Sequence, residues 1–157
     1  MSFSSPPDQR YFEDYVPGTV HEFGSIEVVE AEVISFARRF DPQPFHTDPE
    51  ASRGNTPLGG IIASGWHTGS MMMRMYVDNY LSTAASLPSP GFDELRWPLP
   101  VRPGDRLSVR CSIIEASRSS SRPDRGRVRS LIEVLNQNRE VVMRMKDIYM
   151  IRCRNHA

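Results

Sequence analysis

The chain has 157 residues, which is enough for one domain that buries roughly two thirds of its unfolded surface. Its 19 basic and 19 acidic residues cancel to a formal net charge of zero, which argues against nucleic acid or an anionic membrane as the main partner. The N-terminus lacks the apolar stretch of a signal peptide, and no segment approaches the ~20 apolar residues of a membrane span. We therefore expect a cytoplasmic protein that acts on small molecules or other proteins.

The first forty residues are predicted to hold an arm, a strand and a helix. Residues 1–10 are mostly polar and contain two prolines, so we expect a flexible arm ahead of a single domain over residues 11–157. Residues 19–29 have the pattern of a strand, and residues 30–40 place apolar side chains at helical spacing. This short helix leads directly to Asp41.

Residues 40–50, F-D-P-Q-P-F-H-T-D-P-E, carry an aspartate and a histidine five positions apart in a proline-stiffened segment. Pro42 and Pro44 cannot continue a helix and push the residue before them toward extended geometry, so we expect Asp41 and His46 on a fixed non-helical turn. A carboxylate and an imidazole directed at one place can share the proton transfers of general acid–base catalysis. By spacing alone, the simpler interpretation is a turn aspartate that caps a backbone amide and a histidine hydrogen-bonded nearby.

Metal binding is another alternative for this segment. Asp41, His46 and Asp48 offer the carboxylate and imidazole ligands that zinc or iron accepts. Asp48 precedes Pro49 and has the pattern of a turn residue, so we predict no metal site. The two cysteines, at positions 111 and 153, lack the spacing of a metal or redox motif and are expected to be buried free thiols.

The rest of the chain predicts one long helix followed by strands. After a loop at residues 50–57, apolar side chains recur every three or four residues from Leu58 to Tyr80, which indicates one helix with a wide apolar stripe. A Pro- and Ser-rich link follows. Strands are predicted over residues 105–113, 127–135 and 141–152, the last two joined by a hairpin turn. The predicted class is α+β, with a single antiparallel sheet that wraps its apolar face around one helix.

Four segments resemble, in order and spacing, the MaoC-like dehydratases, also described as (R)-specific enoyl-CoA hydratases. They are D-P-Q-P-F-H-T-D from Asp41, L-G-G-I-I-A-S-G-W from Leu58, P-V-R-P-G-D from Pro100 and N-Q-N-R-E-V-V from Asn136. The first segment is the most specific, because it combines the aspartate, the histidine and the proline between them. The resemblance spans about residues 11–152 and implies the hotdog fold, a curved antiparallel sheet around a central helix. The periodicity independently predicts a similar arrangement.

The resemblance also implies catalytic roles. Asp41 and His46 would hold and activate a water molecule, and the backbone N–H of Gly65, at the start of the central helix, would bind the thioester carbonyl oxygen. An N–H in a first helical turn has no partner within the helix and lies at the positive end of the helix dipole. Many members of the family carry a histidine before this glycine, whereas this chain has Ser64. His67 is given no chemistry, because a helix residue satisfied locally or at an interface is the simpler interpretation.

Other residues are candidates for contact with the substrate. The candidate pocket residues are Pro44, Phe45, Ser64 and Trp66. The methionines at 71–73 and 75 could line an acyl chain, although a core or interface role is commoner. The arginine-rich segment 117–129 could meet the phosphates of coenzyme A, although a solvated hairpin loop is the simpler interpretation.

The leading functional hypothesis is a lyase that reversibly hydrates an enoyl-CoA thioester to a 3-hydroxyacyl-CoA. It needs no cofactor, because coenzyme A is part of the substrate. The alternatives are a hotdog acyl-CoA thioesterase and a non-catalytic subunit that binds acyl thioesters. The turn with Asp41 and His46 favours the hydratase. Members of the family usually pair by joining two sheets edge to edge, so we also expect a homodimer or a higher homo-oligomer.

Overall fold

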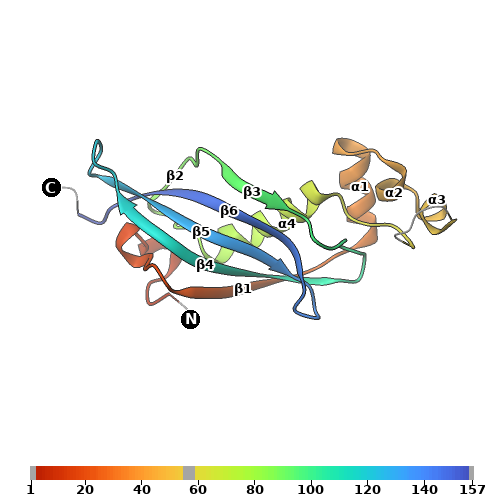
Figure 1. Cartoon of the computed structure of the whole chain (residues 1–157), viewed down its shortest axis with the longest axis horizontal. Helices are drawn as coiled ribbons and strands as arrows, with labels where there is room; N and C mark the ends of the chain where they lie inside the picture. Colours follow the sequence, from red (N-terminus) through yellow and green to blue (C-terminus); the bar gives the residue numbers. More distant parts are fainter. Residues whose placement is uncertain (1–2, 55–58, 156–157) are drawn as a thin grey trace.

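The structure is a computed structural model that describes residues 3–54 and 59–155 (Figure 1). A curved antiparallel sheet wraps around one long helix, α4 (Gly65–Asn79). The long strands lie side by side in the order β1 (Val20–Glu27), β4 (Arg106–Arg118), β5 (Arg125–Leu135) and β6 (Val141–Arg152). Both short strands, β2 (Ser86–Leu87) and β3 (Phe92–Arg96), pair with the free side of β6. This arrangement confirms the predicted α+β class.

The alternation of apolar and polar residues decides which face of the sheet covers the helix. On β4, the side chains of Leu107, Val109, Cys111 and Ile113 are buried, whereas their neighbours in sequence face outward. The strand continues past the predicted end at residue 113 to Arg118, with a register shift after Ile113. The predicted strand at residues 141–152 coincides with β6.

Helix α4 fills the concave side of the sheet with the buried side chains of Met71, Met72, Met75 and Tyr76. The prediction of one helix from Leu58 was wrong for residues 59–64, and Leu58 itself lies outside the described residues. The segment before the helix is irregular, and the N–H groups of Ile62 and Ala63 bond to the carbonyls of Phe45 and Val101. Ser64 then caps the helix by accepting a hydrogen bond from the Trp66 N–H (3.3 Å).

Three helices cluster at one end of the sheet (Figure 1). Residues 55–57 of the predicted loop lie outside the described residues. Helix α1 (Glu30–Phe40) has the predicted bounds, but other parts of the turn and loop predicted after it are helical. They form α2 (Pro44–Thr47) and α3 (Pro49–Gly54), each of which begins with a proline. Proline suits the first position of a helix, since its missing N–H would be unpaired there in any case. His46 therefore lies in a short helix and not in a non-helical turn.

The N-terminal residues pack against the rest of the domain through η1 (Pro7–Gln9) and η2 (Phe12–Asp14). Arg10 is buried, and its Nη1 donates hydrogen bonds to the carbonyls of Asn79 (2.6 Å) and Tyr80 (3.2 Å) at the end of α4. The ring of Phe3 stacks on that of His21, with 4.0 Å between centroids. Residues 3–10 thus differ from the expected flexible arm, because Arg10 satisfies carbonyls that the helix end leaves unpaired.

A buried polar network joins α4 to the centre of the sheet. The hydroxyl of Tyr76 donates a hydrogen bond to the carboxylate of Asp147 on β6, which also accepts one from the Ser130 N–H on β5 (3.1 Å). Burial raises the pKa of Asp147 to about 6. These bonds fix the helix relative to two strands.

Three expectations from the sequence, on the cysteines, a metal site and a membrane span, can be compared with the described residues. Both cysteines are buried and free, as predicted. Within residues 3–54 and 59–155, no group of three or more His, Cys, Asp or Glu side chains is arranged to hold a metal ion. None of the helices in the same ranges has the length and apolarity needed to cross a membrane.

Two glycines, one before β1 and one within it, allow a matched stability test. Gly18 and Gly24 both have positive φ, at 86° and 79°, but only Gly24 lies against a neighbour, because an added Cβ would be 2.8 Å from the Cβ of Met75 on α4. We expect Gly18→Ala to lower the free energy of unfolding by about 1 kcal/mol, through the left-handed backbone alone. Gly24→Ala should cost roughly 2 to 4 kcal/mol, because it adds overpacking. Urea denaturation followed by circular dichroism measures both, and equal losses would contradict the close packing of β1 on α4.

Candidate active site

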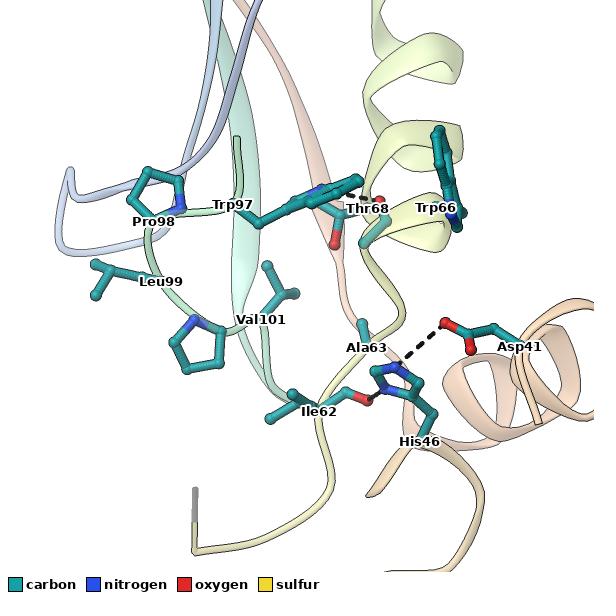
Figure 2. Close-up of a pocket in the computed structure, with 12 residues that line it drawn as sticks. Asp41, His46, Ile62, Ala63, Trp66, Thr68, Trp97, Pro98, Leu99 and Val101 are labelled. Carbon is teal, nitrogen blue, oxygen red and sulfur yellow. Dashed lines mark hydrogen bonds and ion pairs between the residues drawn. The ribbon is translucent and has the colours of Figure 1, made fainter. Parts of the chain in front are cut away.

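A cavity of about 440 Å³ opens at the end of the sheet where α1 to α3 lie (Figure 2). Its walls come from the segment after α1, the start of α4 and the segment after β3. The lining residues are Asp41, His46, Ile62, Ala63, Gly65, Trp66, Thr68, Trp97, Pro98, Leu99, Pro100 and Val101. The predicted pair and the predicted glycine therefore meet in one cavity.

Asp41 caps the C-terminal end of α1, and its carboxylate is held from two directions. Gln43 Nε2 donates to Oδ1 (2.6 Å), and Ser64 Oγ donates to Oδ2 (2.7 Å). These two hydrogen bonds hold the pKa of the Asp41 carboxyl below its ordinary value, because both favour the ionised form. Asp41 is therefore a carboxylate at neutral pH.

His46 is buried in α2, and its ring is fixed by the backbone before α4. Its Nδ1 lies 2.7 Å from the carbonyl oxygen of Ile62. A carbonyl can only accept a hydrogen bond, so Nδ1 carries the hydrogen and neutral His46 has its lone pair on Nε2. That nitrogen lies 3.3 Å from Asp41 Oδ2, as Figure 2 shows.

Asp41 Oδ2 and the lone pair on His46 Nε2 are both hydrogen-bond acceptors, so their close approach requires a hydrogen that one of them carries or that a third molecule donates. A proton on His46 Nε2 supplies it directly, and a water molecule that donates to both atoms supplies it when the imidazole is neutral. The pair can therefore take a proton from water and give one back, which is the requirement for a general acid–base centre.

Gly65 is the first residue of α4 and lines the cavity, so its N–H lies in the first helical turn. The reason for a glycine there is steric, because a side chain would collide with the indole of Trp97. The glycine therefore makes room for Trp97 and does not provide an open approach for a ligand. A Cβ at Gly65 would be 2.8 Å from Cδ2 and Cζ2 of the indole. Trp97 Nε1 also donates a hydrogen bond to the Gly65 carbonyl (3.1 Å).

The segment from Trp97 to Val101 forms the wall opposite α2 and was not singled out as pocket lining from the sequence. Figure 2 shows Trp97, Pro98 and Leu99 across the cavity from Asp41 and His46. Prolines at 98 and 100 keep this wall extended without a regular ladder. The run W-P-L-P before the P-V-R-P-G-D segment was the available signal.

The four candidate pocket residues separate into two groups. Trp66 lines the cavity, whereas Pro44, Phe45 and Ser64 lie behind its walls. Phe45 packs edge-on against the ring of His46, with 4.5 Å between centroids, and Ser64 is fully buried behind Asp41. Phe45 and Ser64 therefore support the pair, and none of the three residues lines the cavity.

Three other candidates have structural surroundings. Asp48 accepts hydrogen bonds from the N–H groups of Glu50 (2.9 Å) and Ala51 (3.1 Å), as expected of a turn residue. His67 stacks on Phe36, with 4.8 Å between centroids, and burial lowers its pKa. The arginine-rich segment 117–129 spans the hairpin between β4 and β5, at the end of the sheet far from the cavity (Figure 1).

Comparison with known proteins agrees with this geometry. A family model described as MaoC like domain matches residues 12–134. The structure is similar to that of a MaoC-like dehydratase from Rhodospirillum rubrum, with a TM-score of 0.85, 38% identity, and 94% of this chain and 99% of that chain covered. It shares its fold with the unliganded R-hydratase PhaJ1 from Pseudomonas aeruginosa, with a TM-score of 0.71, 23% identity, and 91% and 86% covered.

A curated relative is also similar in sequence. The uncharacterized protein YdeM from Bacillus subtilis (strain 168) is 26% identical over 126 residues, which are 80% of this chain and 86% of YdeM. The curved sheet around a central helix is the hotdog fold, as the structural neighbours show.

The surroundings of Asp41 predict a titration shift. Gln43→Ala and Ser64→Ala should each raise the pKa of the Asp41 carboxyl, so that its charge is lost at a higher pH than in the parent protein. Ser64→Ala also removes the helix cap and should cost about 1 kcal/mol of stability. A carbon-13 NMR titration of the Asp41 side chain measures the pKa without requiring activity.

Ser70→Ala is the matched control for that titration, because the Ser70 hydroxyl bonds to the Trp66 carbonyl on the same helix and does not touch Asp41. An Asp41 pKa that is the same in the parent and in all three variants would contradict the role of the two donors.

Proposed function

Because the chain belongs to the MaoC-like domain family, we propose that it is a lyase that reversibly hydrates a 2-enoyl-CoA thioester to the 3-hydroxyacyl-CoA. The observation that carries the proposal is the pairing of His46 Nε2 with Asp41 Oδ2, 3.3 Å apart, in the cavity that Gly65 also lines. The 38% identity with the Rhodospirillum rubrum MaoC-like dehydratase supports it.

In the hydration direction, Asp41 and His46 hold the attacking water through Oδ2 and Nε2. As a C–O bond forms between the water and C3, one of the pair removes a water proton, and the electrons of the C2=C3 bond move toward the thioester oxygen. A proton then returns to C2, so that one water is added in total. Dehydration is the reverse of these steps.

The negative charge that develops on the thioester oxygen needs a donor in place before the reaction. The N–H of Gly65 fulfils this role, since it lies at the N-terminal end of a 15-residue helix. Loss of one such donor typically costs about 10²- to 10³-fold in rate. The reaction uses only these groups and the substrate, so we propose no cofactor.

A thioesterase would use the same activated water to attack the thioester carbon. The hydratase is favoured because the cavity places a carboxylate and an imidazole together. Such a pair suits the removal of a proton from the water that attacks C3 and the delivery of a proton to the neighbouring C2. Release of free coenzyme A distinguishes the two reactions.

The first test follows the absorbance of crotonyl-CoA. Asp41→Ala and His46→Ala should each lower kcat/KM by about 10²- to 10⁴-fold, because each removes a proton-transfer group. Asp48→Asn is the control, since Asp48 lies in the same segment and its carboxylate accepts hydrogen bonds from backbone amides of α3. Equal rates in the parent and both alanine variants would refute the mechanism, and release of free thiol without hydration would favour the thioesterase.

We also propose that two chains pair along β3 to form a homodimer. Among the described residues, no strand pairs with the second side of β3, and an unpaired edge favours addition of another strand. Beside it, three large apolar side chains are more than two fifths exposed: Trp66, Met73 and Phe92. A second copy across this edge would cover them.

Light scattering on a sizing column tests the dimer. The parent protein should elute with twice the mass of one chain, and Met73→Glu with Phe92→Glu should give a monomer, because two charges would be buried at the interface. Ile114→Glu is the control, because Ile114 is 54% exposed and lies on β4, away from the β3 edge. A monomeric parent would disprove the pairing.

A further inference from the structure

Trp97 packs against the first residue of α4. It follows β3 directly, and its indole lies against Gly65, where the Cβ of any other residue would collide with the ring. One hydrogen bond, from Nε1 to the Gly65 carbonyl, and an edge contact with Trp66, at 5.4 Å between centroids and 77° between planes, hold it there. The side chain is 40% exposed, so it is not a core residue.

The two tryptophans border two cavities at once. On one side lies the catalytic cavity of about 440 Å³, and on the other lies a groove of about 220 Å³ between α4, β3 and β6. Besides Trp66 and Trp97, the groove is lined by Gly69, Ser70, Met72, Met73, Phe92, Leu95, Met143 and Met145. The tryptophan pair is therefore the partition between the reacting centre and this groove.

The chemistry of the groove suits an unbranched alkyl chain. Four of its lining residues are methionines, whose flexible thioethers adapt to irregular apolar shapes. Its one hydroxyl, that of Ser70, donates a hydrogen bond to the Trp66 carbonyl (2.8 Å). The lining includes no charged side chain, so a phosphate or an adenine of coenzyme A would find no polar partner there.

We infer that Trp97 sets the length of acyl chain that the enzyme accepts, an inference that rests on the proposed hydratase function. With the indole on Gly65, the catalytic cavity ends at Trp97 and takes short acyl chains. A longer chain would have to displace the indole or remain in water. Removal of the indole joins the cavity to the methionine-lined groove and gives a longer chain an apolar path.

The alternative is that Trp97 only packs on the helix start. Trp97→Ala separates the two roles, because it removes the ring that divides the two cavities. Its control is Trp97→Phe, which retains an aromatic ring over Gly65 but loses the hydrogen bond to the carbonyl. If the indole acts as the wall, this variant keeps the parent preference for chain length. Gly69→Leu is the converse change, since an added Cβ at Gly69 meets nothing closer than Met143 Cε at 3.8 Å and the leucine side chain would fill the groove.

The experiment measures kcat/KM for crotonyl-, hexenoyl-, octenoyl- and decenoyl-CoA in the parent, Trp97→Ala, Trp97→Phe and the double variant Trp97→Ala with Gly69→Leu. The parent should favour crotonyl-CoA over decenoyl-CoA. Trp97→Ala should raise the decenoyl to crotonyl ratio by about tenfold or more, on the scale of discrimination that apolar pockets achieve. Trp97→Phe should match the parent, and Gly69→Leu should restore the parent ratio in the alanine variant.

A binding measurement keeps this inference separate from the proposed reaction. Calorimetry with the saturated butyryl-, octanoyl- and decanoyl-CoA should show that affinity grows with chain length in Trp97→Ala and not in the parent. If no variant hydrates any thioester but this difference in affinity is present, the proposed hydratase function is wrong and the proposed role of Trp97 in chain-length selection is retained. If hydration occurs and the decenoyl to crotonyl ratio of kcat/KM is unchanged in Trp97→Ala, the proposed role of Trp97 in chain-length selection is wrong.

Trp97→Leu repeats the test with a residue that still packs on Gly65, so that a folding defect in the alanine variant does not decide the outcome. It should move the ratio in the same direction as Trp97→Ala. A ratio equal to that of the parent in the folded leucine variant, as judged by its melting curve, would overturn the inference.

Discussion

The candidate active site depends on how two residues before α4 are held by two other segments, α2 and the segment after β3. The N–H of Ile62 bonds to the Phe45 carbonyl (3.0 Å), its carbonyl accepts from His46 Nδ1 (2.7 Å), and the N–H of Ala63 bonds to the Val101 carbonyl (2.8 Å). These bonds fix His46, the start of the helix and the far wall relative to one another. Because α4 is in turn buried in the sheet, the whole domain maintains the geometry of the cavity.

Neutral donors surround Asp41, and this has a consequence for its charge. Gln43 and Ser64 stabilise the carboxylate without bringing a positive charge close to it. A histidine at position 64, which the family resemblance would suggest, could carry its own proton and compete for the same oxygen. With serine there, Asp41 and His46 are the ionisable side chains among the described residues that line the cavity.

Sequence periodicity predicted the regular elements well and the short ones badly. Helix α1 and strand β6 follow uninterrupted patterns and have the predicted bounds. The prolines at 44 and 49 suggested turns, because a pattern does not show whether a proline breaks a helix or begins one. Asp41, His46 and Gly65 were predicted from motifs close in sequence. Trp97 was missed, because its contact with Gly65 spans 32 residues and exists only in the fold.

The order of strands also limits when the cavity can form during synthesis. Strand β6 is the last element of the chain, yet it lies between β5 and the earlier strands β2 and β3. Until it emerges from the ribosome, β3 has no partner in the sheet, and the wall that begins at Trp97 lacks the strand that holds its β3 end. Asp41, His46 and α4 are all made long before that point. The proposed chemistry thus becomes available only when β6 is inserted, which makes the reaction a reporter of that step.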